Sequence, residues 1–472
     1  MKLETLFGSF PFRGDGTIEI NHIVCDSRKV TEGCAFVCIE GYASDGHDFA
    51  ETACKQGAAV IIAQKEISVS CPVVQVDDTR KALAVLCANF HDNPSRKFRL
   101  VGVTGTNGKT TTTFLVKHIL DQMGYKTGLI GTNQNMIGDR VIETSRTTPD
   151  AFELQGLFSQ MAEEGAQVVV MEVSSHALYL DRVYDCDFDV GAFTNITQDH
   201  LDFHKTMEDY LKAKMLLFQM CKKGVVNIDD PHASAILSSG TCPFLTFGID
   251  HEADFKGKEI ALHQEGVSFR VGKTQYHLAI PGKFSVYNAL CAIGICRALD
   301  IPDDQIAKGL ATAHGVRGRA QVVDMGADYT VLIDYAHSPD GMENILKTAR
   351  GFAKGRVVIL FGCGGDRDSK KRPIMGKIAS ELADFCIITS DNPRTEKPGA
   401  IIEQILTGVT GTNYIVIENR REAIEYAIRN ARKDDVIILA GKGHETYQTI
   451  GTENIHFDEQ EILEEIRDQQ KG

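Results

Sequence analysis

The sequence lacks several patterns that would assign it to a familiar class of protein. Its 13 cysteines are scattered and include no C-x-x-C pair, which argues against both a disulfide framework and a zinc cluster. We therefore expect them to be small buried hydrophobic residues in a reducing cytosol. No apolar run approaches the ~18 residues that cross a bilayer, and the first residues lack the apolar core of a signal peptide. These absences predict a cytoplasmic protein.

Positive charge is also in short supply. The chain has 50 Lys and Arg residues against 64 Asp and Glu residues, so its formal net charge is −14. Because nucleic-acid binding needs a basic surface, we expect no nucleic acid among the partners. The lack of a long apolar run likewise predicts that no membrane is a partner. Two catalytic signatures are missing as well. No G-x-S-x-G elbow marks a serine nucleophile, and no C-terminal strand leads into the G-x-G-x-x-G turn of a dinucleotide-dependent oxidoreductase.

What the 472 residues do contain is a repeated alternation of short apolar runs and helical segments. Runs such as AQVVVMEV, RVVILFG and DVIILAG are continuous in apolar residues, which is typical of parallel strands covered on both faces. Residues 254–281 alternate in polarity and predict a small antiparallel element. We predict an α/β protein of three domains. These are a smaller N-terminal α/β domain at 1–98, a central P-loop-type parallel-sheet ATPase domain at 99–325, and a C-terminal Rossmann-like domain at 326–472.

The stretch RLVGVTGTNGKTT predicts a nucleotide site, because an apolar strand runs through a glycine turn directly into a helix. Val103 stands where the strict phosphate-loop pattern has its first glycine, but Gly105 and Gly108 still allow backbone N–H groups to turn around phosphates. Lys109 supplies a cation, and Thr110 supplies a hydroxyl group for Mg²⁺. ATP is favoured over GTP because no guanine-reading motif is evident.

Two further loops follow strands of the same predicted sheet. They carry Glu172, Ser174 and His176 in one case, and Asn195, Asp199 and His200 in the other. Ligands of open α/β sheets collect beyond the carboxyl ends of the strands. Each residue alone could be structural, but together they predict that Glu172 and His200 reach a metal held at Thr110.

Loops of the predicted C-terminal domain form a third group of polar residues. The segments FGCGGDRD, TSDNPRTE and LAGKGHE each follow an apolar strand and would face one crevice. Loops rich in Asp and Arg are often only solvated. The mixed charges nevertheless favour a zwitterionic ligand, held by residues from this group: Arg367, Asp391, Asn392, Arg394, His444 and Glu445.

Nine segments of the chain resemble, in order, the motifs of the Mur ligases. They are TGTNGKTTT, MEVSSHAL, FTNITQDHLDFH, YLKAKMLLF, GRAQ, DYAHSPD, GGDRD, DNPRTE and GKGHE. The resemblance implies an ADP-forming amide ligase of peptidoglycan precursor synthesis that uses ATP and Mg²⁺. We expect the protein to be a monomer. A substrate carboxylate is phosphorylated, and the acyl phosphate is then attacked by an amine. The segments are closest to members acting on UDP-N-acetylmuramoyl-L-Ala-D-Glu.

Site residues are implied by the same resemblance, position by position. For ATP they are Gly105, Thr106, Asn107, Gly108, Lys109, Thr110, Thr111, Asn288, Arg319 and Asp334. For the UDP-linked dipeptide they are Cys25, Ser27, Tyr42, Ala43, Ser44, Thr147, Thr148, Ser174 and Arg182. Lys109, Glu172, His200 and Lys214 are the implied catalytic residues, and Thr110, Glu172, His200 and Lys214 the implied metal ligands.

From the segment MEDYLKAKMLLF alone, Lys214 would be predicted to be an ordinary exposed lysine. In the family the matching lysine is carbamylated by CO₂, which turns an ammonium group into an anion able to hold Mg²⁺. The resemblance therefore implies an N6-carboxylysine at position 214.

The amino acid to be added is implied by the segment DNPR. Family members that add meso-diaminopimelate have this segment, whereas those that add L-lysine lack the arginine. An arginine fork grips the carboxylate that distinguishes the two amino acids. The implied diaminopimelate contacts are Arg367, Asp391, Asn392, Pro393, Arg394, Gly441 and Glu445. The alternatives are a lysine-adding ligase, a folylpolyglutamate synthase and, in another class, a P-loop ATP hydrolase.

Overall fold

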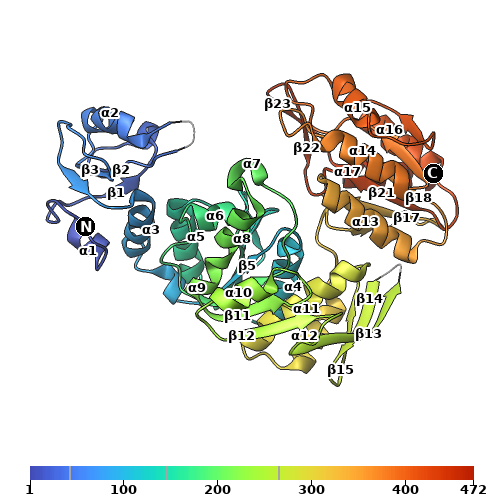
Figure 1. The fold of residues 1–472 in the computed structure, drawn as a ribbon, viewed down its shortest axis with the longest axis horizontal. Helices are drawn as coiled ribbons and strands as arrows, with labels where there is room; N and C mark the ends of the chain where they lie inside the picture. The colour runs from blue at the N-terminus through green and yellow to red at the C-terminus, as the bar shows by residue number, and fades with distance from the viewer. Residues whose placement is uncertain (42–43, 145, 264–265, 472) are drawn as a thin grey trace. The chain divides into compact units, whose positions relative to one another are not determined.

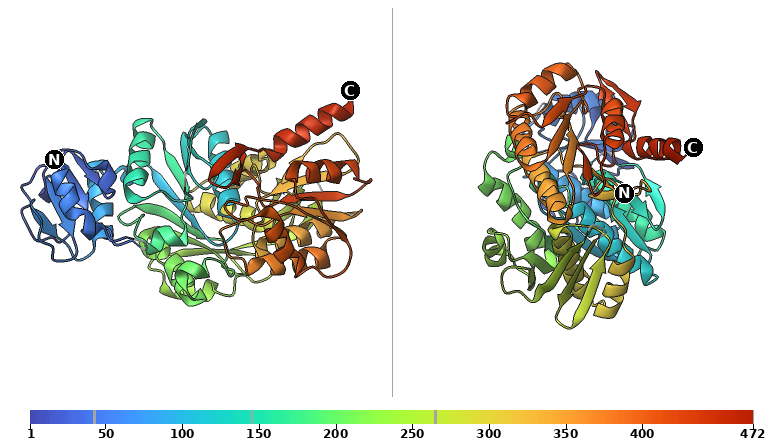
Figure 2. Two further views of the ribbon diagram at one scale, coloured as in Figure 1. Left: turned by 90° about the horizontal axis from the view of Figure 1, so that it is seen from above. Right: turned by 90° about the vertical axis from the view of Figure 1, so that its right-hand side faces the viewer.

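The computed structural model describes residues 1–41, 44–144, 146–263 and 266–471 (Figures 1 and 2). The chain divides into two compact units. The first comprises Met1–Thr246 with Gly294–Asp300, and the second comprises Phe247–Ile293 with Ile301–Gly472. Both units are α/β, as the sequence predicts. No helix in the described part of the chain is long and apolar enough to cross a membrane.

The first unit begins with a four-stranded parallel sheet of order β1-β2-β3-β4, drawn in blue in Figures 1 and 2. Its elements are α1 (Leu3–Phe7), β1 (His22–Val24), β2 (Cys34–Val37), α2 (Ala50–Lys55), β3 (Val60–Ala63), β4 (Val73–Gln75) and α3 (Thr79–Phe90). Helix α3 begins after Asp78, whose side chain accepts hydrogen bonds from the backbone N–H groups of Arg80 and Lys81. The sheet carries one buried apolar cluster with α1 and α3 and another with α2.

One cysteine prediction is wrong in this part of the chain. Cys54 at the end of α2 and Cys71 in the loop before β4 form a disulfide bond. The two cysteines are 17 residues apart, and no short motif such as C-x-x-C marks them as a pair. Only the folded structure therefore reveals the disulfide bond. Among the other cysteines, nine are buried and Cys25 and Cys242 are partly buried, as expected for small hydrophobic residues.

The rest of the first unit is a larger sheet in which the strands lie in the order β12-β11-β10-β5-β9-β6-β7-β8. Strands β11, β10, β5, β9 and β6 are parallel, whereas β7 and β8 are antiparallel to their neighbours. The strands are β5 (Arg99–Thr104), β6 (Thr127–Ile130), β7 (Asn135–Ile137), β8 (Arg140–Ile142), β9 (Val168–Glu172), β10 (Phe188–Phe193), β11 (Cys221–Asn227) and β12 (Phe244–Gly248). The helices are α4 (Lys109–Gln122), α5 (Ala151–Glu163), α6 (Ser175–Tyr179), α7 (Leu201–His204), α8 (Met207–Met215), α9 (Leu217–Met220) and α10 (Ala233–Ser239).

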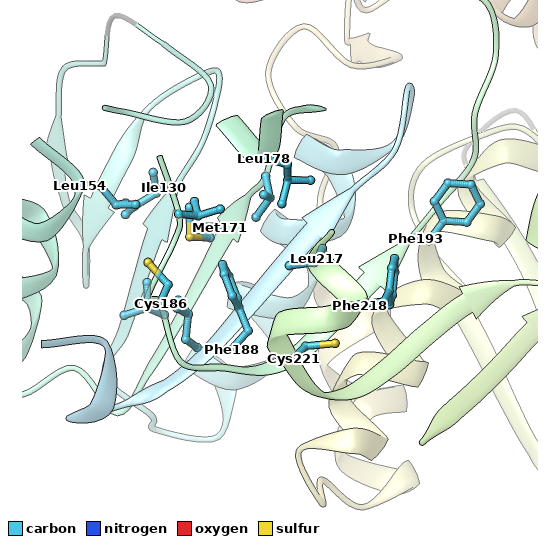
Figure 3. Close-up of a cluster of buried hydrophobic side chains, with 14 of the residues drawn as sticks. Ile130, Leu154, Met171, Leu178, Cys186, Phe188, Phe193, Leu217, Phe218 and Cys221 are labelled. Carbon is cyan, nitrogen blue, oxygen red and sulfur yellow. The ribbon is translucent and has the colours of Figure 1, made fainter. Parts of the chain in front are cut away.

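Apolar residues of this sheet and its helices form one buried core. Figure 3 shows part of it, in which Phe188 of β10 and Met171 of β9 lie with Leu217 and Phe218 of α9. Strand β5 runs between β10 and β9, so the ends of three adjacent parallel strands are held at one edge of the sheet. This edge positions the loops that carry the predicted phosphate and metal sites.

The second unit contains a three-stranded antiparallel element and a six-stranded sheet. The former comprises β13 (Phe255–His263), β14 (Gly266–Val271) and β15 (Thr274–Leu278), as predicted for 254–281. The six-stranded sheet has the order β16-β17-β21-β18-β19-β20 and is parallel apart from β16. Its strands are β16 (Gln321–Val323), β17 (Thr330–Asp334), β18 (Val357–Phe361), β19 (Phe385–Ile388), β20 (Tyr414–Val416) and β21 (Val436–Ala440).

Helices of the second unit cover both faces of this sheet, with a separate apolar cluster on each face. They are α13 (Pro339–Phe352), α14 (Lys371–Leu382), α15 (Pro398–Leu406), α16 (Arg420–Arg429) and α17 (Glu459–Lys471). Two earlier helices are α11 (Lys283–Ala298) and α12 (Asp303–Thr312), and α12 packs against β15 of the antiparallel element. A hairpin of β22 (Tyr447–Ile450) and β23 (Glu453–His456) follows β21. The predicted domain boundaries at residues 98 and 325 stay predictions.

Candidate active site

The phosphate-loop motif lies between β5 and α4, where the sequence predicts it. Gly105 and Gly108 have positive φ angles of 154° and 84°, and a Cβ atom at Gly105 would lie 1.9 Å from Oγ1 of Thr194. Glycine is therefore required at position 105 by both conformation and space. Val103 is a buried residue of β5. The position of the first glycine in the strict pattern therefore belongs to the strand, and the loop begins after it.

Lys109 is curled over this loop. Its Nζ atom donates to the carbonyl oxygens of Gly105 at 3.0 Å and of Thr106 at 2.8 Å. The loop is also tied to the end of β10, because Asn195 accepts from the backbone N–H of Asn107 at 2.9 Å. A cation and several backbone N–H groups are thus gathered at the start of α4, as phosphate binding needs.

Glu172, at the end of β9, is joined to Thr110 on α4. The Thr110 hydroxyl donates to Oε1 of Glu172 at 3.0 Å, and Thr132 donates to the same carboxylate from its backbone N–H and its hydroxyl. Glu172 is 1% exposed. A buried carboxylate beside a threonine hydroxyl presents oxygen ligands of the kind that Mg²⁺ prefers, so these two residues fit the predicted metal.

Lys214 has the placement least expected from its local sequence. On α8 it is 1% exposed, and its Nζ atom donates to the carbonyl oxygen of Gly105 at 2.8 Å. It also lies 4.4 Å from the centre of the Tyr210 ring. Burial, and then the positive charge of Lys109, hold the pKa of Lys214 well below its ordinary value. The structure therefore brings Lys214 to the phosphate loop, while its modification stays a prediction.

The ring centres of His200 and Tyr210 lie 6.0 Å apart. The Tyr210 hydroxyl is in turn 3.1 Å from Oγ1 of Thr106. His200 has a positive φ angle of 54°, and its ring centre is 4.8 Å from that of His176. Its predicted role as a metal ligand stays a prediction.

A cavity of about 770 Å³ in the first unit contains Cys25 and Arg182, two of the residues predicted to hold the UDP-linked substrate. Burial raises the pKa of the Cys25 thiol to about 11, so this cysteine is neutral near pH 7. The sequence prediction missed four cations of the lining, namely Arg28, Lys29, Arg80 and Arg146. The pair Arg28 and Lys29 directly after Ser27 is the local signal that could have indicated them in an otherwise acidic chain.

Other residues predicted for this substrate form a hydrogen-bonded group around Thr148. Its hydroxyl accepts from the backbone N–H of Ser174 at 3.0 Å, and its carbonyl oxygen accepts from Arg182 at 3.0 Å. Oγ1 of Thr147 lies 3.0 Å from Oγ1 of Thr132, whose hydroxyl donates to Glu172, so the group is linked to that carboxylate. Tyr42 and Ala43 lie outside the described residues. Ser27 begins a short 3₁₀ turn, and Ser44 accepts from the backbone N–H of Gly41.

The remaining ATP residues predicted from the sequence belong to the second unit. Asn288 is buried on α11. The guanidinium of Arg319 lies 4.8 Å from the centre of the Tyr335 ring. Asp334 accepts from the backbone N–H groups of Ala320 and Ala336. Burial raises the pKa of Asp334, and the charge of Arg319 opposes this shift.

The predicted zwitterion site is also assembled within the second unit. The Asn392 side chain donates to Oε2 of Glu445 at 2.8 Å, although 53 residues separate them. Arg394 donates from Nη1 to the carbonyl oxygen of Gly365 at 2.8 Å. Asp391 is buried, which acts to raise its pKa, but the charges of Arg420 and Lys442 and the N–H of Asn392 hold the pKa below its ordinary value.

Glycines and backbone contacts complete this cluster. Gly441 has a φ angle of 114°, and a Cβ atom there would lie 2.6 Å from Oδ2 of Asp391. Arg367 is exposed, and its side chain lies near Gly364, as does that of Arg394. The carbonyl oxygen of Pro393 lies against Gly365. His444 is half-buried beside Tyr335, and burial lowers its pKa to about 4, so it is neutral near pH 7.

Comparison with known proteins identifies the family. Three family models match in succession. The one described as "Mur ligase family, catalytic domain" matches residues 19–91, "Mur ligase middle domain" matches 103–296, and "Mur ligase, glutamate ligase domain" matches 318–443. A curated relative from Clostridium acetobutylicum, UDP-N-acetylmuramoyl-L-alanyl-D-glutamate--2,6-diaminopimelate ligase 1, is 50% identical over 477 residues, with 99% of each chain covered. The chain belongs to the Mur ligase family.

Two further Mur ligases extend the comparison. The 2,6-diaminopimelate ligase of Clostridium botulinum is 49% identical over 468 residues, which cover 97% of both chains. A solved structure of a UDP-N-acetylmuramoyl-L-alanyl-D-glutamate--2,6-diaminopimelate ligase matches with a TM-score of 0.75 and 30% identity, and covers 100% of this chain and 99% of that one. The α/β architecture of this Mur ligase is thus that of its family.

Proposed function

We propose that this Mur ligase adds meso-diaminopimelate to UDP-N-acetylmuramoyl-L-Ala-D-Glu, with ATP converted to ADP and phosphate, in peptidoglycan precursor synthesis. The relatives named above support this reaction through their printed activity. The observation that carries the choice of amino acid is the cluster of Arg394, Asn392 and Glu445. It offers a guanidinium fork for a carboxylate and a carboxylate for an ammonium group.

The large cavity of the first unit is proposed to hold the UDP-linked dipeptide. Cations from several elements line it, and a diphosphate is the part of that substrate that such cations would neutralise. The hydroxyl of Thr148 accepts from the backbone N–H of Ser174, and the guanidinium of Arg182 donates to the backbone carbonyl oxygen of Thr148, so both side chains are held in place. We propose that these two residues, with Thr147 and Ser174, orient the dipeptide whose free carboxylate is phosphorylated.

Phosphoryl transfer to that carboxylate joins two anions, so it depends on positioning and on neutralising charge. We propose that the N–H groups from Gly105 to Thr111 hold the ATP phosphates, and that Lys109 moves from the loop carbonyls onto the transferred phosphoryl group. Thr110 and Glu172, with His200 and a carbamate on Lys214, would hold Mg²⁺, which supplies further neutralisation of phosphoryl oxygens when bound. In the second unit, Asn288, Arg319 and Asp334 are the proposed ATP contacts.

Carbamylation of Lys214 is supported by the burial of its side chain and by the distance of 2.8 Å between its Nζ atom and the carbonyl oxygen of Gly105. A carbamate forms when the neutral amine attacks CO₂ and loses a proton, so an amine kept from water is suited to the reaction. The carbamate would place a negative charge close to the positive charges of Lys109 and the metal ion. We further propose that the protein acts in the cytoplasm and is a monomer. We also propose that its three domains are divided at residues 98 and 325.

Phosphate release from purified protein tests the reaction. The protein is supplied with Mg·ATP and UDP-N-acetylmuramoyl-L-Ala-D-Glu, and then with meso-diaminopimelate, with L-lysine or with no amine. Release that requires diaminopimelate, with a product of the added mass, is the expected result. Release with lysine in its place would retain the ligase and refute the role given to Arg394. Release that is independent of any amine would indicate an ATP hydrolase.

A further inference from the structure

Lys442 is a buried cation at the centre of the proposed diaminopimelate site. It directly follows Gly441 after β21, and its side chain is 0% exposed. Its Nζ atom lies 3.0 Å from Oδ1 of Asn392 and 3.2 Å from Oε2 of Glu445. These two residues are the ones proposed to contact the ligand. An ammonium group that is closed off from solvent can act on a ligand only through them.

The contacts of Lys442 determine which way the Asn392 amide faces. Oδ1 of Asn392 accepts from Lys442 and from the backbone N–H of Thr449 at 3.0 Å, and Nδ2 donates to Glu445 at 2.8 Å. A rotation of the amide by 180° would place its NH₂ group against two donors and its oxygen against a carboxylate. Lys442 therefore leaves one N–H of Asn392 and Oε1 of Glu445 for other partners.

The surroundings of Lys442 fit a charged ammonium group. The Tyr447 and Phe457 ring centres lie 5.7 Å and 5.8 Å from its Nζ atom, distances at which a cation is attracted to a ring face. Its charge is also one of those that lower the pKa of the buried Asp391. A neutral side chain of the same size would leave the carboxylate of Glu445, which is only 13% exposed, without its cationic partner.

We propose that Lys442 is a positioning residue for the amino-acid substrate: it orients the Asn392 amide and the Glu445 carboxylate so that they receive the ammonium and carboxylate groups of one amino-acid centre. This inference rests on the proposed function and adds a residue to it. Rather than contacting the ligand, Lys442 sets the direction of the two groups that do.

The experiment compares Lys442→Met, Glu445→Gln and the double variant with the parent enzyme, by KM and kcat for diaminopimelate and KM for ATP. The parent enzyme is assayed first, and absence of product at that stage would refute the proposed function itself. Lys442→Met is expected to raise the KM for diaminopimelate by roughly 30-fold or more, with a change of less than about threefold in the KM for ATP. In the Glu445→Gln background the same substitution is expected to raise the KM for diaminopimelate by clearly less than in the parent enzyme, because the part of its effect transmitted through Glu445 is already lost and only the part through Asn392 remains.

Arg356→Met is the matched control. Arg356 pairs with the buried Asp435 at the start of β21, at the opposite end of the strand from Lys442. It is expected to lower Tm with an unchanged KM for diaminopimelate. If Lys442→Met lowers Tm in the same way and leaves that KM unchanged, Lys442 is only structural and the proposal is wrong. If the two substitutions multiply in the double variant, Lys442 acts independently of Glu445 and the proposal is also wrong. Should Lys442→Met alone fail to fold, the double variant compared with Glu445→Gln decides between the same outcomes.

Discussion

The Nζ atom of Lys214 lies 2.8 Å from the carbonyl oxygen of Gly105 in the phosphate loop, although 109 residues separate them. Lys214→Ala is expected to reduce phosphate release by about 10²-fold or more, because it removes a group from the site of charge neutralisation. Bicarbonate should not restore this activity, whereas acetate should restore part of it by supplying a carboxylate in place of the carbamate.

Lys212→Ala is the control for that experiment. Lys212 is on the same helix, is exposed, and pairs with Glu208 at the surface. Its loss should change activity by less than about twofold, since an exposed pair contributes little. Full activity in the Lys214→Ala enzyme would contradict the proposed carbamate.

Arg394→Ala is expected to raise the KM for diaminopimelate by roughly 10²- to 10³-fold, because a desolvated carboxylate loses its charged partner. The KM for ATP should change little. Arg394→Lys should recover only part of the loss, since an ammonium group cannot make two parallel hydrogen bonds. Equal increases in both KM values would show that Arg394 supports the structure and does not contact the amino acid.

Gly365→Ala is expected to displace the DNPR segment. The added Cβ atom would lie 1.9 Å from the carbonyl oxygen of Pro393, and backbone at both positions must move apart. We expect a loss of about 1–3 kcal/mol in the free energy of unfolding and a higher KM for diaminopimelate. Denaturation with urea and steady-state kinetics measure the two effects.

Gly351→Ala provides the comparison. Gly351 is in helix α13, and apart from its chain neighbours and the backbone of its own helix no atom of the described residues lies within 4 Å of the position that its Cβ atom would take. The substitution should raise the free energy of unfolding by up to about 1 kcal/mol through helix propensity and leave KM unchanged. A loss at Gly351 as large as that at Gly365 would contradict the steric explanation.

Glu396→Gln is expected to destabilise the folded protein near pH 7, and to do so less as the pH falls toward the folded pKa of Glu396. Hydrogen bonds from Arg372, and then the N–H of Asp366, lower the pKa of Glu396 to about 2 from 4.5. A carboxyl group whose pKa is lower in the folded state stabilises that state above the unfolded pKa and loses this effect as the pH falls toward the folded pKa. The cost at pH 7 should be about 1–2 kcal/mol after allowance for solvent screening.

Urea denaturation of both proteins at pH 7 and at pH 3.5 checks this dependence. The difference between parent and variant should be smaller at pH 3.5. Gln404, which also accepts from Arg372, is a neutral comparison: Gln404→Ala should have a cost that does not change between the two pH values. A cost of Glu396→Gln that is equal at both would contradict the assigned cause.

How far the site could be predicted depends on how local its parts are. The strand, glycine turn, Lys109 and Thr110 lie within about a dozen consecutive residues, and the preference for phosphate follows from that segment alone. The four further cations of the large cavity come from three separate segments, and the overall composition gives no sign of them because the chain as a whole is acidic. The disulfide between Cys54 and Cys71 was missed because the two residues are 17 positions apart and come together only in the folded chain.

The sequence by itself determined the α/β class, because continuous apolar strands must be covered on both faces, and it determined the order of the motifs. Only the tertiary structure decided that Lys214 is buried and that Lys442 lies between Asn392 and Glu445. A lysine on an isolated helix or loop keeps its ammonium group in water. Its charge becomes specific only where distant segments pack around it and leave a few oxygen atoms as its partners.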